Sequence, residues 1–317
     1  MKYNIRTLIA LLRHHNRTDV WRMLDYADEH NLHLSSAKEL YEIANIAEDN
    51  RMLSKSRKFK LPITDFESAI YDADISIDTC YRQGIKIVSY FDVDNYPQQL
   101  LDLEHKGYND APLILYYKGD IRTVGNVEGI AIIGTRHPTP EGEKMGEYFG
   151  RKFAEMGLNI VSGLALGCDA AAHRGALSAN GITTAFLPNG LDIIRPSQNA
   201  DLASKILSSG GALVSEYPPG TPNTHDNYAE RDRLQAGLAD ATLLIQSDIK
   251  KGGSFNAIRT SLENGKPVFA VKYTGSLLGH PMVAGNELLI REGKAKPLTQ
   301  GDEENVILEI EKSLGNL

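Results

Sequence analysis

Apolar residues recur at helical spacing through the first part of the chain. Leu8 and Leu11 lie three positions apart, and no glycine interrupts the sequence before Gly84. This spacing predicts helices with one buried face. A short strand at 85–89 follows, and then a segment with two X-Pro steps that favour extended backbone. We therefore expect residues 1–105 to form a small helical domain with a connecting segment.

A different pattern begins near residue 128, where short apolar runs alternate with amphipathic helical stretches. The predicted strands lie at 130–133, 159–161, 183–187, 212–214, 241–245 and 267–271. Such alternation is typical of right-handed βαβ units and a parallel sheet. We therefore predict an α/β fold: residues 106–298 form a doubly wound, Rossmann-like parallel sheet, and residues 299–317 form a C-terminal tail helix.

The composition narrows the class of protein. With 42% hydrophobic and 24% charged residues, the chain has the composition of an ordinary globular protein. Cys80 and Cys168 cannot form a disulfide framework and have no metal-ligand spacing. The apolar run at 8–12 is too short for a signal peptide or a membrane span, so we expect a cytoplasmic protein without a membrane partner. We assign no catalytic residue, no cofactor and no metal ligand.

The charge balance bears on nucleic-acid binding. A formal net charge of −7 argues against a protein that coats nucleic acid over its whole surface. This net charge is compatible with a local basic pocket, because charges are screened within about 10 Å at moderate salt. One basic run without acids spans residues 51–60. We interpret this run as a solvated linker, with a DNA contact as the alternative.

Ligands of doubly wound sheets bind at the carboxyl ends of the strands, so the residues that follow each strand deserve comparison. Gly134, Thr135 and Arg136 follow the first predicted strand of the sheet, and Ser162 and Gly163 follow the second. A glycine at a strand-to-helix turn exposes backbone N–H groups to an anion, and an arginine can donate to phosphate. Alternatively, Gly134 only forms the turn, and Arg136 pairs with a surface acid.

The second of these turns continues through Gly167 into a helix that carries Cys168, Asp169 and His173. We expect Asp169 to cap this helix and His173, four residues later, to pair with it. Cys168 is compatible with a thiolate nucleophile beside these residues, but a buried small hydrophobic residue is the more common use of a free cysteine.

Two further basic segments belong to the predicted sheet edge. Arg231 and Arg233 fall within one helical turn, separated by Asp232. Another helix is preceded by a candidate phosphate-binding turn, which consists of Lys250, Lys251, Gly252, Gly253 and Ser254. Several anion-friendly sites on one edge indicate an extended polyanion or a nucleotide as the ligand.

Taken in order, these motifs resemble those of the DprA/Smf (DNA-processing protein A) family, over roughly residues 88–298. The resemblance rests on Gly134-Thr135-Arg136, Ser162-Gly163 to Asp169 and His173, Leu187 to Gly190, Pro196 with Asn199, Ser215 to Gly220, Arg231 with Arg233, Gly265 to Val271, and Gly285-Asn286 to Gly293. It implies a Rossmann-like domain behind a small helical domain, usually working as a homodimer.

The resemblance also implies a function. The family binds single-stranded DNA in a basic pocket and helps to load a RecA-type recombinase during DNA uptake in natural transformation. By position, Arg136 and Arg231 would be arginines of this pocket. Ser162, Gly163 and the turn at 252–254 would line the pocket beside them. Phosphate contacts of this kind are sensitive to salt and independent of sequence.

The chain departs from the family at several places. Most members have Arg-Asn-Arg where this chain has Asp232 between its arginines, and Ser-Gly-Ser/Thr where it has Gly252-Gly253-Ser254. The chain ends soon after the predicted sheet, so we expect it to lack the C-terminal winged-helix-like domain of many members. The alternative function is a nucleotide-binding sensor or a phosphoribohydrolase-like enzyme on the same fold. The first acid after Ser254 is Glu263, which argues against the enzyme.

Overall fold

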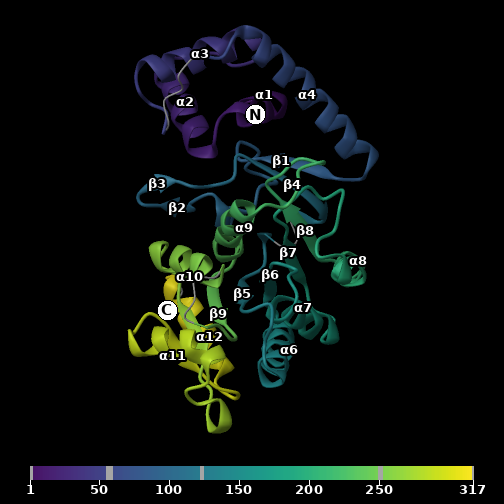
Figure 1. Ribbon diagram of the computed structural model, residues 1–317, viewed down its shortest axis with the longest axis vertical. Helices are drawn as coiled ribbons and strands as arrows, with labels where there is room; N and C mark the ends of the chain where they lie inside the picture. The colour runs from purple at the N-terminus through teal and green to yellow at the C-terminus, as the bar shows by residue number, and fades with distance from the viewer. Residues whose placement is uncertain (1–2, 55–59, 122–124, 249–252, 316–317) are drawn as a thin grey trace.

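The structure is a computed structural model that describes residues 3–54, 60–121, 125–248 and 253–315 (Figure 1). Within these residues, nine strands form one sheet with the order β1-β4-β8-β7-β6-β5-β9-β10-β11. Its strands are β1 (Lys86–Ser89), β4 (Ile114–Gly119), β5 (Gly129–Ile133), β6 (Asn159–Ser162), β7 (Thr183–Phe186), β8 (Ala212–Ser215), β9 (Ala241–Leu244), β10 (Val268–Val271) and β11 (Lys296–Leu298). A separate two-stranded ribbon consists of β2 (Glu104–His105) and β3 (Tyr108–Asn109).

The sheet is doubly wound, as predicted. From β5 the chain builds β6, β7 and β8 outward on one side, then returns to place β9, β10 and β11 on the other side. All of these neighbours pair in parallel, for example Ile132 with Leu243 between β5 and β9. The order of the strands therefore reverses between β5 and β9, which is the switch point where such sheets bind ligands.

Helices cover both faces of the sheet, because successive side chains of a strand point to opposite faces. Ile130 and Ile132 of β5 pack with Phe149 on one face, whereas Ala131 packs with Leu234 on the other. The first face is covered by α6 (Pro140–Glu155), α7 (Cys168–Ser178), α8 (Ala200–Ser208) and α12 (Glu303–Ser313). The second is covered by α9 (His225–Leu238), α10 (Ser254–Glu263) and α11 (Ala284–Arg291). Short 3-10 helices lie at Gln98–Leu100, Ser197–Asn199, Gly275–Leu277 and Pro281–Val283.

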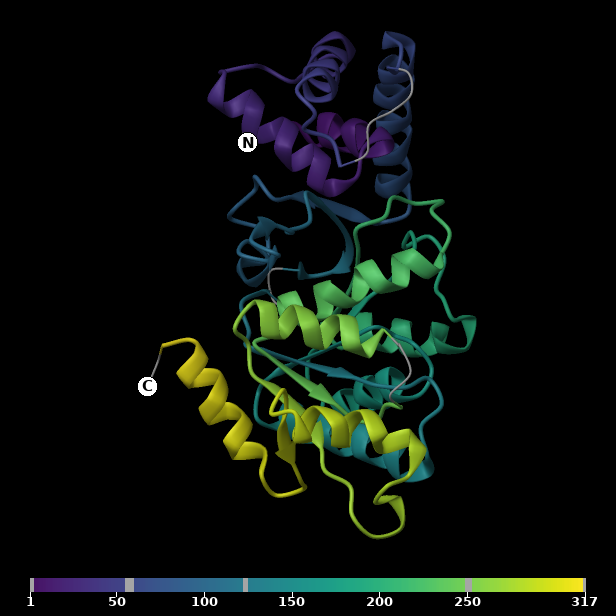
Figure 2. The same cartoon turned by 60° about the vertical axis from the view of Figure 1, so that its left-hand side comes forward.

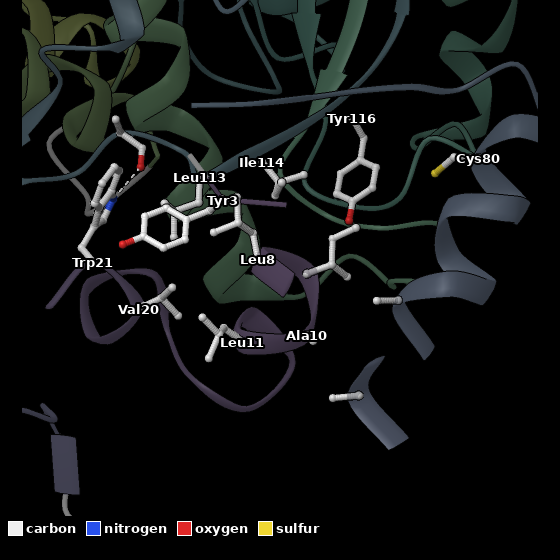
Figure 3. Close-up of a cluster of buried hydrophobic side chains, with 14 of the residues drawn as sticks. Tyr3, Leu8, Ala10, Leu11, Val20, Trp21, Cys80, Leu113, Ile114 and Tyr116 are labelled. Atoms are coloured by element: carbon white, nitrogen blue, oxygen red, sulfur yellow. Dashed lines mark hydrogen bonds between the residues drawn. The ribbon is translucent and has the colours of Figure 1, made fainter. Parts of the chain in front are cut away.

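The N-terminal helices form a separate layer at one end of the sheet (Figure 2). They are α1 (Ile5–His14), α2 (Arg17–Glu29), α3 (Ala37–Asp49) and α4 (Ile63–Arg82). Their core is continuous with that of the sheet, because Leu8 and Trp21 belong to the same buried cluster as Ile114 and Tyr116 of β4 (Figure 3). Trp21 Nε1 also donates a hydrogen bond to the carbonyl of Ala111 at 3.1 Å. In the described part of the chain, no helix has the length and apolarity to cross a membrane.

The structure differs from the sequence analysis at the junction of the two layers. The strand expected to end the helical domain, β1, pairs antiparallel with β4, and β4 pairs antiparallel with β8. Both strands therefore extend the main sheet, and Ile114–Gly119, which is absent from the predicted strands, is a partly to fully buried strand. The division of the chain at residue 105 stays a prediction.

Candidate functional site

A pocket of about 940 Å³ opens at the carboxyl ends of β5 and β9, at the switch point of the sheet. Its walls come from the loop at 134–136, from Ala165 and Asp169, from residues 223–235, from Ser247 and Asp248, and from residues 253–257. Segments far apart in the sequence thus converge on one cavity. Gly134, Thr135, Arg136, Arg231, Gly253 and Ser254 of the sequence-predicted residues line it.

Arg231 lies at the bottom of this pocket with 4% of its surface exposed. Its Nη1 donates to the carbonyl oxygens of Gly163 at 2.5 Å and Phe186 at 2.7 Å. Its Nε donates to Asp232 Oδ1 at 3.1 Å. A Cβ at position 163 would clash with Nη1 of Arg231, so only glycine allows this close approach. The guanidinium therefore ties α9 to the ends of β6 and β7.

Arg136 is exposed at the rim of the pocket, on the loop after β5. The centre of its guanidinium lies 4.5 Å from the centroid of the Tyr228 ring, and that of Arg231 lies 5.9 Å from the same centroid. Stacking of this kind is a favourable cation–π contact and leaves the N–H donors of Arg136 free for a ligand. Among the described residues, Arg136 forms no ion pair with a surface acid, and its charge acts instead on the buried carboxyls of Asp169 and Asp232.

Carboxylates share the pocket with these arginines. Asp232 is 6% exposed, and its Oδ1 also accepts a hydrogen bond from Gln235 Nε2 at 3.0 Å. Burial raises the pKa of Asp232 to about 6, although Arg231 favours its charged form, and Asp169 adds to the increase. Burial likewise raises the pKa of Asp169, against the effect of Arg231. Of the described residues, no group of three metal-ligating side chains is positioned to hold a metal ion.

Two expectations about α7 were wrong. The helix begins at Cys168 with Gly167 as its N-cap, in a backbone conformation with φ of 78°. Asp169 therefore lies in the first turn instead of capping the helix, and it accepts a hydrogen bond from Ala165 N at 3.3 Å. His173 does not pair with Asp169, because its buried Nδ1 lies 2.6 Å from Thr183 Oγ1.

The buried groups of α7 have structural roles. Burial lowers the pKa of His173 to about 3, and the charge of Arg231 adds to the decrease, so the imidazole is neutral. Burial raises the pKa of Cys168 well above that of a free thiol. Cys168 is fully buried and packs closely against Gly134. A buried, protonated thiol is a poor nucleophile, in agreement with the preferred interpretation of this cysteine.

Four described residues of the sequence-predicted set lie outside the pocket lining: Ser162, Gly163, Gly167, which is the N-cap of α7, and Arg233. The side chain of Arg233 is 7% exposed and forms ion pairs with Asp110 at 3.1 Å and Glu216 at 2.7 Å. Ser162 is fully buried, and its hydroxyl donates to the carbonyl of Ile132 at 2.7 Å. Gly163 contributes through its carbonyl, which Arg231 binds. Each of these residues supports the walls of the pocket from behind.

Two basic segments fall partly outside the described residues. Lys250, Lys251 and Gly252 of the predicted phosphate-binding turn lie there, as do residues 55–59 of the basic run. Lys60, at the end of that run, pairs with Asp49 at 2.7 Å. Both side chains of this pair are largely solvent-exposed, which is typical of a surface contact.

Several residues of the site were not predicted from the sequence, above all Tyr228 and Gln235. Tyr228 precedes Arg231 by three residues, and Gln235 follows it by four, so all three lie on one face of α9. This helical spacing was the signal that could have identified them. Asn223 adds support at the rim, because its Nδ2 lies 3.0 Å from the Tyr228 hydroxyl.

Comparison with known proteins agrees with this geometry. Protein Smf of Escherichia coli (strain K12) is 36% identical to the chain over 202 residues, which make up 64% of this chain and 51% of that protein. The chain thus spans about half the length of this curated relative. The X-ray structure of DNA processing protein A from Streptococcus pneumoniae superposes with a TM-score of 0.76 at 27% identity, over 98% of this chain and 99% of that one.

A second solved structure is also similar. DNA processing protein A from Helicobacter pylori, described for its unique single-stranded DNA binding mode, superposes with a TM-score of 0.59 at 27% identity, over 73% of this chain and 96% of that one. The profile of the family called DNA recombination-mediator protein A matches residues 86–309, which include the whole sheet and the pocket. The chain therefore belongs to the DNA recombination-mediator protein A family, the family of the DprA and Smf proteins.

Proposed function

We propose that the pocket at the switch point binds single-stranded DNA. The observation that carries this proposal is the exposed guanidinium of Arg136, held over the Tyr228 ring at the rim of the pocket. An arginine held in this way offers a fork of donors to a phosphate, and the aromatic ring beside it offers a surface to a base. The similarity to the Helicobacter pylori protein supports the same ligand.

In this proposal the residues of the pocket have different roles in binding the strand. Arg136 contacts phosphate, and the start of α10 at Gly253 and Ser254 adds the positive end of a helix dipole. Arg231 contributes its charge from below while it holds Gly163 and α9 in place. Gly134, Thr135, Ser162, Gly167 and the turn from Lys250 to Gly252 complete the proposed set, and Arg233 supports it from behind.

The proposal extends to the cellular role expected from the family. We propose that the chain works in the cytoplasm as a homodimer that binds single-stranded DNA and helps to load a RecA-type recombinase in DNA recombination or uptake. Membership in the DNA recombination-mediator protein A family supports this role.

A nucleotide-binding function is the second candidate, and one observation favours it. Asp169 and Asp232 place two buried carboxylates beside Arg231 in the same pocket. Carboxylates oppose the binding of a polyanion, but they suit hydrogen bonds to a ribose or a base edge. A pocket used in this way would hold one nucleotide and exclude a longer strand.

The decisive test is a titration of fluorescent poly-dT, a few tens of nucleotides long, at two salt concentrations. Matched duplex DNA and mononucleotides serve as competitors. We expect tight binding that weakens with salt and that neither competitor displaces. Displacement by a mononucleotide would support the nucleotide-binding function, and absence of poly-dT binding would refute the proposal.

A further inference from the structure

Helix α9 carries two sets of functional groups on different sides. Tyr228, Arg231 and Gln235 line the pocket. Glu230 and Arg233 point elsewhere and belong to an ion network below the N-terminal helices. Helix α9 therefore connects the pocket to the layer of N-terminal helices (Figure 1). The core of that layer is continuous with the core of the sheet.

The network contains two arginines and three carboxylates. Arg233 pairs with Asp110, Glu216 and Glu230 at 3.1, 2.7 and 3.7 Å. Arg17 contacts the same three carboxylates: it pairs with Asp110, with Glu216 at 3.4 Å and with Glu230 at 3.2 Å. Each carboxylate is therefore shared between an arginine of α9 and an arginine of α2.

Most of this network is shielded from water. The side chains of Arg17, Asp110, Glu216 and Arg233 have exposed fractions of 16, 12, 12 and 7%. Removal of one partner from a buried ion network leaves uncompensated charge, so such a network holds its members in fixed positions. Salt also screens a buried network less than it screens surface pairs.

Arg17 cannot easily move away from this position. It is the first residue of α2, whose N-cap Asn16 accepts a hydrogen bond from Asp19 N. On the next turn of α2, Trp21 is 7% exposed and donates to the carbonyl of Ala111, beside Asp110. The N-terminal helices therefore hold Arg17 in a fixed position next to α9.

We propose that Arg17 is a positioning residue for the nucleic-acid pocket, acting through Glu216, Glu230 and Arg233 on the orientation of α9. This inference rests on the function proposed above. Without Arg17, three carboxylates share the single charge of Arg233 at the side of α9 that faces away from the pocket. Glu230 and Arg233 must then rearrange. Tyr228 and Arg231, which lie two residues before and one residue after Glu230 on the same helix, move with them.

The first experiment measures poly-dT affinity for Arg17→Ala and Arg17→Lys. We expect affinity to fall about fivefold for the alanine variant and less for the lysine variant, which keeps the charge. Arg13→Ala is the matched control, because Arg13 is an exposed arginine of the same helical layer that pairs with Asp72 at 3.3 Å. Its affinity should stay close to that of the wild type.

Glu216→Ala separates positioning from long-range electrostatics. Loss of a negative charge near the pocket strengthens polyanion binding if only the overall field matters. Loss of the network weakens binding if positioning matters, so the two effects have opposite signs. We expect Glu216→Ala to bind poly-dT more weakly than the wild type does.

If Arg17→Ala fails to fold, amide hydrogen exchange in a milder variant still tests the inference. In the milder Arg17→Lys variant, amides of α9 should exchange faster than in the wild type, while those of α6 stay unchanged. Unchanged poly-dT affinity in Arg17→Ala, or stronger binding in Glu216→Ala, would overturn the inference. If the wild type itself does not bind poly-dT, the proposed function fails first, and exchange in α9 still tests the network.

Discussion

Asp232 accepts a hydrogen bond from Arg231 Nε at 3.1 Å, so a buried carboxylate neutralises the buried guanidinium that precedes it in the sequence. An asparagine at this position would accept a hydrogen bond without adding a charge. Because burial raises the pKa of Asp232 to about 6, this neutralisation depends on pH. Below that pH, the carboxyl is protonated, and Asp232 no longer opposes the charge of Arg231.

Binding of poly-dT should therefore strengthen as the pH falls through about 6. We expect the affinity at pH 5.5 to exceed that at pH 7.5 by about threefold or more, because one negative charge leaves the pocket. In Asp232→Asn this difference should largely disappear. The measurement is fluorescence anisotropy at constant ionic strength. Histidines gain charge in the same range, so His225→Gln, which alters an exposed pocket residue, serves as the control.

The same group should make stability depend on pH. The folded-state pKa of Asp232, about 6, lies above its ordinary value of 3.8. Its contribution to stability is thus fully present below 3.8 and is lost as the pH rises through about 6. We expect the Tm of the wild type to fall relative to that of Asp232→Asn between pH 4 and pH 7. Parallel Tm profiles for the two proteins would contradict the assignment.

Gly163→Ala should damage both stability and the pocket. A methyl group at position 163 clashes with Nη1 of Arg231, which has no room to retreat because Phe186 holds the same nitrogen. Overpacking of this kind costs about 1–3 kcal/mol of the free energy of unfolding, measured by chemical denaturation. The double variant with Arg231→Ala is the control: without the guanidinium, Gly163→Ala should cost much less. Equal costs in both backgrounds would show that the clash is not the cause.

Much of the fold could be predicted from the sequence, because each parallel strand has a distinct apolar run. Residues 130–133 and 241–245, for example, correspond to β5 and β9, and their adjacency defines the pocket. Strand β4, which lies between β1 and β8, was missed because Pro112 and Gly119 bound its short apolar run and made it resemble irregular backbone. Its antiparallel pairing with β8 also gives no signal in a pattern of βαβ units.

The site was harder to predict, because side-chain direction decides it. Arg231 and Arg233 lie two residues apart, so on a helix they point to nearly opposite sides, and only one can face the pocket. Their spacing alone does not show which one does. His173 was expected to pair with Asp169 on its own helix, but it lies closest to Thr183 at the start of β7. Such long-range partners depend on tertiary packing.

Lys266→Met should destabilise the protein through the end of α9. Lys266 Nζ donates to the carbonyl oxygens of Ala236, Gly237 and Ala239 at 3.2, 2.6 and 2.8 Å. These groups lie at the C-terminus of the helix, where carbonyls lack partners within the helix. We expect a loss of about 2–3 kcal/mol in the free energy of unfolding. Lys38→Met, at an exposed surface pair, should change stability little, and equal losses for both lysines would contradict this role.

Arg136→Ala should weaken poly-dT binding and change its dependence on salt. If Arg136 contacts a phosphate, its loss lowers the slope of log affinity against log salt by about 0.7 per contact. Arg231→Ala should weaken binding as well, but by disturbing Gly163 and α9, which its buried guanidinium holds. The salt slope therefore distinguishes the two arginines. Arg136 would contact a phosphate directly and release its counterions on binding, whereas the buried Arg231 would only hold the pocket in shape.

Tyr228 variants complete this test, because they alter the support of Arg136 and leave its charge in place. Tyr228→Phe keeps the ring below the guanidinium and loses only the hydrogen bond with Asn223, so we expect nearly wild-type affinity. Tyr228→Ala removes the ring, and a base–aromatic contact of this kind is worth about 1–3 kcal/mol. We expect weaker binding with an unchanged salt slope, since no phosphate contact is lost. An unchanged slope in Arg136→Ala would instead remove Arg136 from the phosphate contacts.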